Sequence, residues 1–284
     1  MKKYFLILYI AVSTAFGAGA QVIPALHDIP KNDPGLQFGI QFTAEAEKKF
    51  NRDFKASIGI EYRMQDYFLY DKQYRFFADA EYKFSKKLSL VGGYTYIGRR
   101  KEGDRLAVRH RFEAGPQESI KLNKKFKLIF TEKLVWTHRA GYINKYQNAR
   151  DDIALKTKAK LQYSPWKICS FFTYFELRTT FREPNLRNLY YDSSLRQFTD
   201  EGGSPVGRPG WFLEGFDKIR INRIRIGLGA DFKPFPHHKI RFTALYDHDQ
   251  ELDIDCDRHG TVIKTLVYDR RHMLYGRLGY VFSF

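Results

Sequence analysis

The stretch Leu274-Tyr-Gly-Arg-Leu-Gly-Tyr-Val-Phe-Ser-Phe284 ends the chain. Side chains of a β-strand alternate between its two faces, so every second residue shares an environment. One face of this strand carries Leu274, Gly276, Leu278, Tyr280, Phe282 and Phe284. The other face carries smaller or polar residues, including Arg277 and Ser283. A period of two that ends on an aromatic residue predicts a strand with one face in lipid and the other in a polar interior.

The same alternation recurs along the chain from Leu36 onward. A strand that crosses a membrane needs about 9–11 residues, and the runs have that length or more. No apolar run after residue 20 approaches the roughly 20 residues of a membrane-spanning helix. We predict eleven strands, at residues 36–47, 54–65, 74–84, 88–99, 105–118, 126–139, 151–163, 168–181, 217–232, 239–251 and 262–284.

The connections between these runs alternate in length. Residues 48–53, 85–87, 119–125, 164–167 and 233–238 form short turns, whereas residues 140–150, 182–216 and 252–261 form longer loops. Short periplasmic turns and long external loops are typical of outer-membrane barrels. We therefore predict an all-β fold, an antiparallel transmembrane β-barrel of about ten to twelve strands that covers residues 36–284.

The number of runs raises a question, because bacterial single-chain barrels usually have an even number of strands. Either residues 21–35 add an irregular strand or a segment in the lumen, or one of the eleven runs is wrong. Pro24, Pro30 and Pro34 argue against a regular strand there.

The start of the chain has the order of a secretory signal peptide. Lys2 and Lys3 precede an apolar run, and small residues follow up to Ala20, which predicts cleavage before Gln21. The expected location is the outer membrane, with its lipid and lipopolysaccharide as partners. The formal net charge is +16, but basic residues alternate with apolar and acidic ones, so we expect no nucleic-acid partner. Cys169 and Cys256 are expected to lie too far apart for a disulfide.

Two resemblances extend this interpretation. The end of the chain resembles the C-terminal assembly signal of bacterial outer-membrane proteins, which implies that Leu278, Tyr280, Phe282 and Phe284 are recognised by the barrel-assembly machinery. The chain as a whole is similar to an uncharacterised outer-membrane barrel family of Bacteroidota-type bacteria, a domain of unknown function. The matching segments are Glu61-Tyr-Arg63, Gly92-Gly-Tyr94, Arg109-His-Arg111 and Phe171-Phe-Thr-Tyr-Phe-Glu176. This resemblance implies an outer-membrane barrel and supplies no reaction.

The polar faces of the runs predict a charged lumen. It would contain Glu45, Glu61, Arg63, Arg75, Asp79, Glu81, Arg109, Arg111, Glu113, Lys133, Glu176, Arg178, Arg225, Asp231, Arg241 and Arg277. Barrels of about eight strands are filled by side chains, whereas open channels are typical of about 16–18 strands. A barrel of intermediate size is expected to be narrow or plugged by an ion-pair network, and a small-solute pore is the alternative.

One position on the lipid side is polar. Folding the fifth and sixth runs about residues 119–125 can place His110 opposite Glu132, with Thr157 nearby on the next run. Such a pair predicts either an outer-leaflet lipid-modifying enzyme, an oligomer contact, or a bulge that turns Glu132 inward. No convincing serine nucleophile accompanies the pair, so the sequence favours a structural, binding or pore-forming protein over an enzyme.

The remaining signals are weak. Asp253, Asp255 and Asp257 have the spacing of a calcium loop, but Lys264 occupies the twelfth position, where such loops need an acid. We expect no metal and no cofactor. The 182–216 loop could be a constriction, a lid or a disordered tip, and a structured lid is favoured.

Overall fold

The computed structural model describes residues 31–65, 71–100, 107–140, 150–188, 191–192, 197–199, 205–206, 211–256 and 262–284. The predicted signal peptide and most of residues 21–35 lie outside this part of the chain. Within it, no helix has the length and apolar character needed to cross a membrane.

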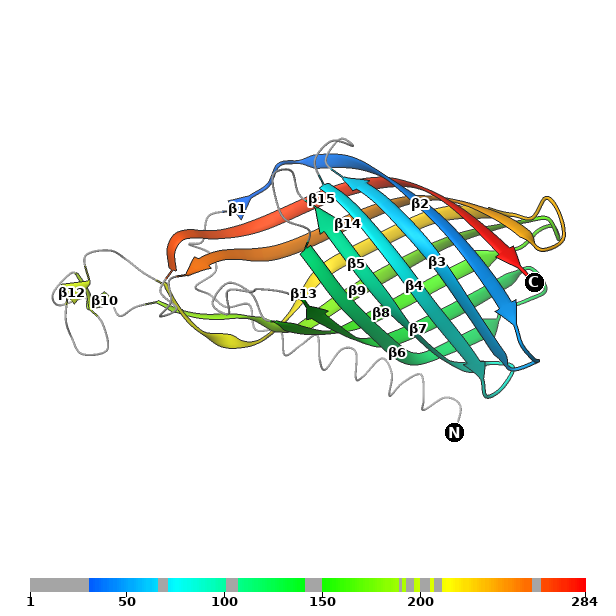
Figure 1. Ribbon diagram of the computed structural model, residues 1–284, viewed down its shortest axis with the longest axis horizontal. Coiled ribbons are helices and arrows are strands. Elements are labelled where there is room, and N and C mark those ends of the chain that lie inside the picture. Colours follow the sequence, from blue (N-terminus) through cyan, green and yellow to red (C-terminus); the bar gives the residue numbers. More distant parts are fainter. Residues whose placement is uncertain are drawn as a thin grey trace.

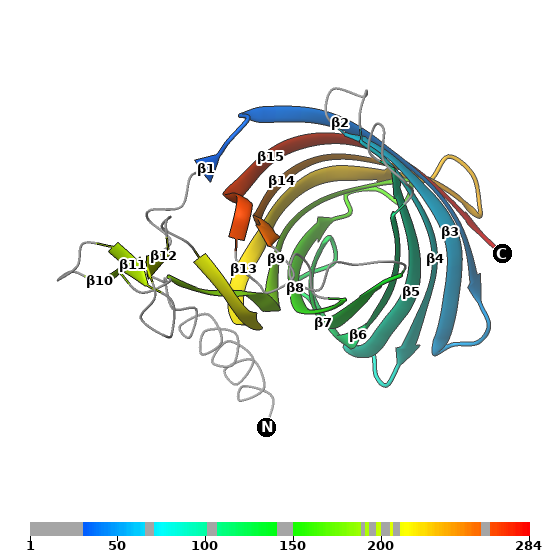
Figure 2. The same ribbon diagram turned by 60° about the vertical axis from the view of Figure 1, so that its left-hand side comes forward.

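Eleven long strands of the described chain form one closed sheet (Figure 1). They are β2 (Leu36–Lys49), β3 (Phe54–Gln65), β4 (Asp71–Lys83), β5 (Leu88–Arg100), β6 (Ala107–Lys121), β7 (Phe126–Arg139), β8 (Asp151–Tyr163), β9 (Cys169–Asn188), β13 (Trp211–Phe232), β14 (His238–Cys256) and β15 (Val262–Ser283). Each pairs antiparallel with the next, and β9 pairs with β13. Figure 2 shows the strands curving round into a single wall. The predicted all-β barrel is confirmed.

The barrel closes through a parallel pair. β15 lies beside β2 in register, with Leu278 next to Phe42 and Ser283 next to Glu47. The short strand β1 (Lys31–Asn32) pairs with the same edge of β15, so it prolongs β2 beyond a kink at Gly35. Gly35 has a φ of 78°, a conformation that glycine adopts without steric cost. The odd number of predicted runs is therefore real: an odd barrel closes when its first and last strands run in the same direction.

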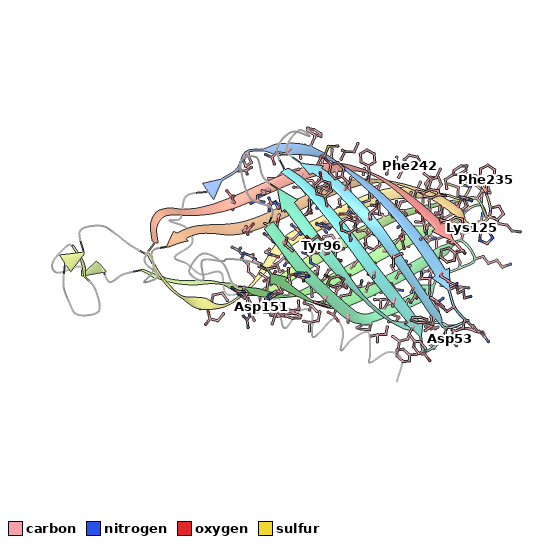
Figure 3. The ribbon with its side chains drawn as sticks, in the orientation of Figure 1. Asp53, Tyr96, Lys125, Asp151, Phe235 and Phe242 are labelled. Atoms are coloured by element: carbon pink, nitrogen blue, oxygen red, sulfur yellow. The ribbon has the colours of Figure 1, made fainter. Side chains whose placement is uncertain are left out.

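Short turns connect the strands at the end of the barrel that contains Asp53, Lys125 and Phe235, which we call the turn end (Figure 3). Three of these turns are stabilised by the same pattern of side-chain to backbone hydrogen bonds. The side-chain oxygens of Asn51, Ser85 and Asn123 each accept hydrogen bonds from the backbone N–H groups two and three residues later. Asn and Ser favour turns because their side chains can replace backbone acceptors in this way.

The opposite end, which we call the loop end, is uneven. β9, β13, β14 and β15 contain 20, 22, 19 and 22 residues, while β2 to β8 contain 12 to 15. The long strands extend beyond the rim as a one-sided wall (Figure 1). The predicted 182–216 loop is correspondingly shorter, because Asn188 pairs with Trp211. A small sheet of β10 (Tyr191–Asp192), β11 (Gln197–Thr199) and β12 (Pro205–Val206) lies past this wall.

The two faces of the wall differ as the alternation predicts. Large apolar side chains are exposed on the outer face, for example Ile58, Leu228 and Phe242 at 65%, 60% and 55%. Phe242 is seen on the outside of the wall in Figure 3. On the inner face, Leu245 and Tyr275 are 0% and 1% exposed and form an apolar cluster with Phe172, Tyr174 and Met273. An exposed apolar band around a polar and aromatic interior is the inverse of a water-soluble protein, and it suits lipid outside.

Candidate functional site

The interior is the candidate functional site, and glycines shape its wall. Aromatic rings from one strand lie flat over glycines of the neighbouring strand, so that a Cβ atom at the glycine would collide with the ring. These pairs are Gly39 with Tyr275, Gly59 with Phe77, Gly227 with Tyr174, and Gly229 with Phe172. The rings therefore stay close to the wall and leave the axis of the barrel to charged side chains.

Cations lie over several of these rings. The Nζ atoms of Lys158 and Lys160 are 3.9 and 4.2 Å from the ring centroids of Tyr174 and Phe172. The guanidinium carbon of Arg63 lies 5.1 Å from the ring centroid of Tyr275. A cation at this distance from an aromatic face is attracted to it, so the rings help to hold these charges in place.

The largest ion-pair network joins β8, β9, β13 and β14. Glu176 contacts Lys158 at 3.7 Å and Arg225 at 3.2 Å. Arg225 also contacts Asp247 at 2.8 Å, and Asp247 contacts Arg223 at 3.3 Å. The side chain of Asp247 is 4% exposed, so its charge depends on these two guanidinium groups for stabilisation.

Smaller networks fill the rest of the interior. Glu61 contacts Arg63 and Arg75, Glu113 contacts Lys133 and Lys156, Asp231 contacts Arg241, Lys55 contacts Glu47 and Glu81, and Arg178 contacts Asp152. The structure places all sixteen predicted lumen residues on interior-facing positions. It brings most of the acids among them into ion pairs.

Several interior residues were absent from the sequence prediction. On β8, Lys156, Lys158 and Lys160 all face the interior, as their pairing with Lys133, Thr131 and Ile129 shows. On β14, Asp247 and Asp249 do the same. The sequence of both strands could have predicted these interior charges, because each charged residue alternates with an outward residue of apolar or interfacial type.

Several interior cations, among them Arg109, Arg111, Lys160 and Arg277, make no ion pair within the part of the chain that the structure describes. Arg111 donates a hydrogen bond to the Thr137 hydroxyl at 3.3 Å and makes no ion pair there. Lys160 contacts the ring of Phe172, and no ion pair of Arg109 or Arg277 occurs among the described residues. The Nε atom of Arg277 is buried and has no hydrogen-bond partner among the described residues. The interior therefore has uncompensated positive charge at several depths.

A cavity of about 250 Å³ lies within the barrel. Arg75, Arg111, Lys156, Arg241 and Arg277 line it, together with Glu45, Glu61, Asp79 and Glu113. Its hydroxyl groups come from Thr43 and Thr95. The interior is thus partly filled rather than solid, and the free space is surrounded by charge.

The predicted His110–Glu132 pair is wrong. His110 lies opposite His138, six residues further along β7 than expected, because β6 continues into the predicted turn as far as Lys121. His110 contacts the Tyr94 hydroxyl at 2.8 Å, while Glu132 accepts a hydrogen bond of 3.4 Å from Thr157. Glu132 shares the outward face with Leu134 and Trp136, so no bulge turns it inward. These contacts offer no assembled acid–base pair.

The outer face near the loop end has a belt of aromatic and histidine side chains. Trp136 and His138 both contact Asp151, at 3.0 and 2.8 Å, and Tyr246 contacts His272 at 2.7 Å. Asp151 and Tyr96 mark this level in Figure 3. Amphipathic rings concentrate where a barrel passes from hydrocarbon to polar surroundings, which suits this belt.

No metal-binding group of three or more His, Cys, Asp or Glu residues occurs within the described ranges. The Asp253–Asp257 segment lies largely among residues whose side chains are not described. Cys169 is a free thiol.

The closed wall, the apolar exterior and the charged interior together define a transmembrane β-barrel. No protein-family model and no curated protein matches the chain. Several solved structures are similar at a low level, and they include the following two. A bacterial polysaccharide outer membrane secretin has a TM-score of 0.40 and 10% identity over 82% of this chain, which spans 63% of the length of that one. The translocator domain of autotransporter NalP from Neisseria meningitidis has a TM-score of 0.36 and 14% identity, over 83% of this chain and 91% of that domain.

Proposed function

We propose that this protein is an outer-membrane barrel that gives small, preferably anionic solutes a narrow passage through its interior. The observation that carries the proposal is a group of interior cations that make no ion pair among the described residues, including Arg109, Arg111, Lys160 and Arg277. Rings of basic side chains in a pore favour anions, because they lower the electrostatic cost of entry.

The size of the passage follows from the fold. Eleven strands lie between the packed barrels of about eight strands and the open channels of about 16–18. The ion-pair networks and the aromatic rings that lie over wall glycines occupy much of the interior and leave a cavity of about 250 Å³. We therefore expect a small conductance and exclusion of large solutes.

The location in the outer membrane is part of this proposal. It is supported by the apolar outward band, the aromatic belt, the short turns at one end, and the sequence signals at both ends. In this orientation the loop end faces outside and the turn end faces the periplasm. Fractionation of cells that express the full chain, with heat-modifiable gel mobility, checks the location.

Planar lipid bilayers test the passage. With a tenfold KCl gradient across the bilayer, the purified protein should show small unitary currents whose reversal potential has the sign of chloride selectivity. Leu228→Ala, on the outward face, serves as a control that should not alter selectivity. Cation selectivity, or the absence of current from protein shown to be folded and inserted, would contradict the proposal.

A further inference from the structure

The interior cavity is lined by charged groups of both signs that make no ion pair among the described residues. Arg111 and Arg277 line it and make no ion pair among the described residues. Asp79 and Glu45 line it too, and they likewise make no ion pair within the described ranges. The other charged lining residues already have partners. Glu61 contacts Arg75, Glu113 contacts Lys156, and Arg241 contacts Asp231.

The carboxylates without ion pairs lie close to other charged groups. Asp79 lies near charges of both signs: Lys133 and Lys156 attract its carboxylate, whereas Glu113 and Glu45 repel it. Its side chain also fills the space over Gly93, where a Cβ atom would collide with the carboxylate. Because neither lysine forms an ion pair with Asp79 among the described residues, the carboxylate remains open to a bound cation.

The unpaired guanidinium groups have the opposite preference. The buried Nε of Arg277 has no acceptor within the described ranges of the chain. A buried donor without a partner costs free energy, which an arriving carboxylate would recover through charge-assisted hydrogen bonds. Arg111 uses Nε for the Thr137 hydroxyl and keeps its terminal nitrogens available. These two groups of opposite charge, a cationic pole and an anionic pole, are therefore complementary to one molecule that carries both charges.

We infer that this cavity binds a small zwitterion, with its carboxylate at Arg111 and Arg277 and its ammonium group at Asp79 and Glu45. The cavity, about 250 Å³, is smaller than the roughly 300–1,000 Å³ of pockets that hold drug-sized ligands. A compact amino acid fits that scale. The inference deepens the proposed passage by naming a solute class, and it rests on the same interior.

Isothermal titration of the full-length protein in detergent at low salt tests the inference without any membrane or gradient. The probes are 4-aminobutyrate and its two halves, butyrate and butylammonium, which have the same carbon skeleton. We expect 4-aminobutyrate to bind at least tenfold more tightly than either half. Equal affinity for butyrate and 4-aminobutyrate would mean a simple anion site, and no measurable binding of 4-aminobutyrate would equally overturn the inference.

Two variants separate the poles. Arg277→Gln should weaken 4-aminobutyrate and butyrate at least tenfold and leave butylammonium unchanged. Asp79→Asn should weaken 4-aminobutyrate and butylammonium at least tenfold and leave butyrate unchanged. Lys55→Gln is the matched control, because Lys55 pairs with Glu47 and Glu81 and does not line the cavity. Uniform loss in all three variants would contradict the two-pole site.

The outcomes for binding and for the passage are distinguishable. Heat-modifiable mobility of each variant first establishes that the barrel has folded. Binding without conductance would leave the zwitterion site standing and refute the passage. Conductance without tighter binding of 4-aminobutyrate than of its two halves would leave the passage standing and refute the zwitterion site.

Discussion

Glu132 and Thr157 lie side by side on the lipid-facing surface, where the Thr157 hydroxyl donates a 3.4 Å hydrogen bond to the Glu132 carboxylate. The two residues pair directly across β7 and β8. A carboxylate on the outward face of a barrel is costly because hydrocarbon solvates it poorly. One long hydrogen bond from a hydroxyl offsets little of that cost.

Replacing Glu132 with Leu should therefore stabilise the barrel. We expect a gain of about 1–2 kcal/mol, since charged groups on the lipid face cost up to about 2–4 kcal/mol and acids cost less than bases. Urea unfolding in lipid vesicles measures the change. The reciprocal control is Leu134→Glu on the same face, which should destabilise. A loss of stability in Glu132→Leu would show that the carboxylate has a partner that offsets its cost.

The aromatic rings that cover glycines make a second prediction. Gly227→Ala should destabilise the barrel by about 1–3 kcal/mol, because the new methyl group forces the Tyr174 ring away from the wall. Gly276→Ala is the matched control, since an added Cβ there meets no atom within 4 Å. Unfolding of both variants in vesicles compares them directly, and equal effects would refute the steric account.

The central ion-pair network should be sensitive to a single break. Arg225→Gln leaves Glu176 and Asp247 without their shared guanidinium group, and removing one partner of a buried pair costs about 3–5 kcal/mol. Lys55→Gln, in a more exposed pair near the turn end, should cost no more than about 1 kcal/mol. Thermal unfolding with heat-modifiable mobility distinguishes the two. A small effect at Arg225 would mean that water enters the network and replaces the lost contacts.

Selectivity should follow the unpaired cations. Arg109→Gln removes a charge near the loop end that makes no ion pair within the described chain, so it should shift the reversal potential toward zero without lowering stability. Thr157→Val, on the lipid face, is a control for the measurement and should leave selectivity unchanged. An unchanged reversal potential in Arg109→Gln would place this residue outside the conducting path.

The parallel closure can be tested by a covalent link. In a background with Cys169 and Cys256 replaced by Ser, cysteines at Glu47 and Ser283 should form a disulfide, because the two residues are partners in the β2–β15 register. Disulfides need Cα atoms about 4.4–6.8 Å apart. Cysteines at Thr43 and Ser283 are the control, since four residues along a strand add roughly 13 Å. Gel mobility after boiling without reductant detects the link, and efficient linking of the control pair would contradict the register.

Alternation alone predicted the wall and its faces. The boundaries of β3 and β7, residues 54–65 and 126–139, agree with the predicted runs, because the lipid side admits few polar residues in a spanning strand. The signal weakens beyond the membrane, where both faces meet water. For that reason the extensions of β9 and β13 to Asn188 and from Trp211 were read as loop.

The candidate site was less accessible to sequence reasoning. Which face Arg225 occupies follows from its own strand, but its contact with Glu176 depends on the register between strands. The misplaced His110–Glu132 pair shows the same limit. The predicted turn at residues 119–125 gave a β6–β7 register that differs from the observed one by six positions on β7. A register error of this kind assigns each residue the wrong partner on the neighbouring strand.

Because β2 and β15 run in the same direction, the chain crosses the barrel wall an odd number of times. The first strand begins at one rim and the last strand ends at the other. In a barrel with an even number of strands, the first strand begins and the last strand ends at the same rim. A hairpin cannot join the first and last strands when they are parallel. Leu36 at the start of β2 and Ser283 at the end of β15 therefore face opposite sides of the bilayer.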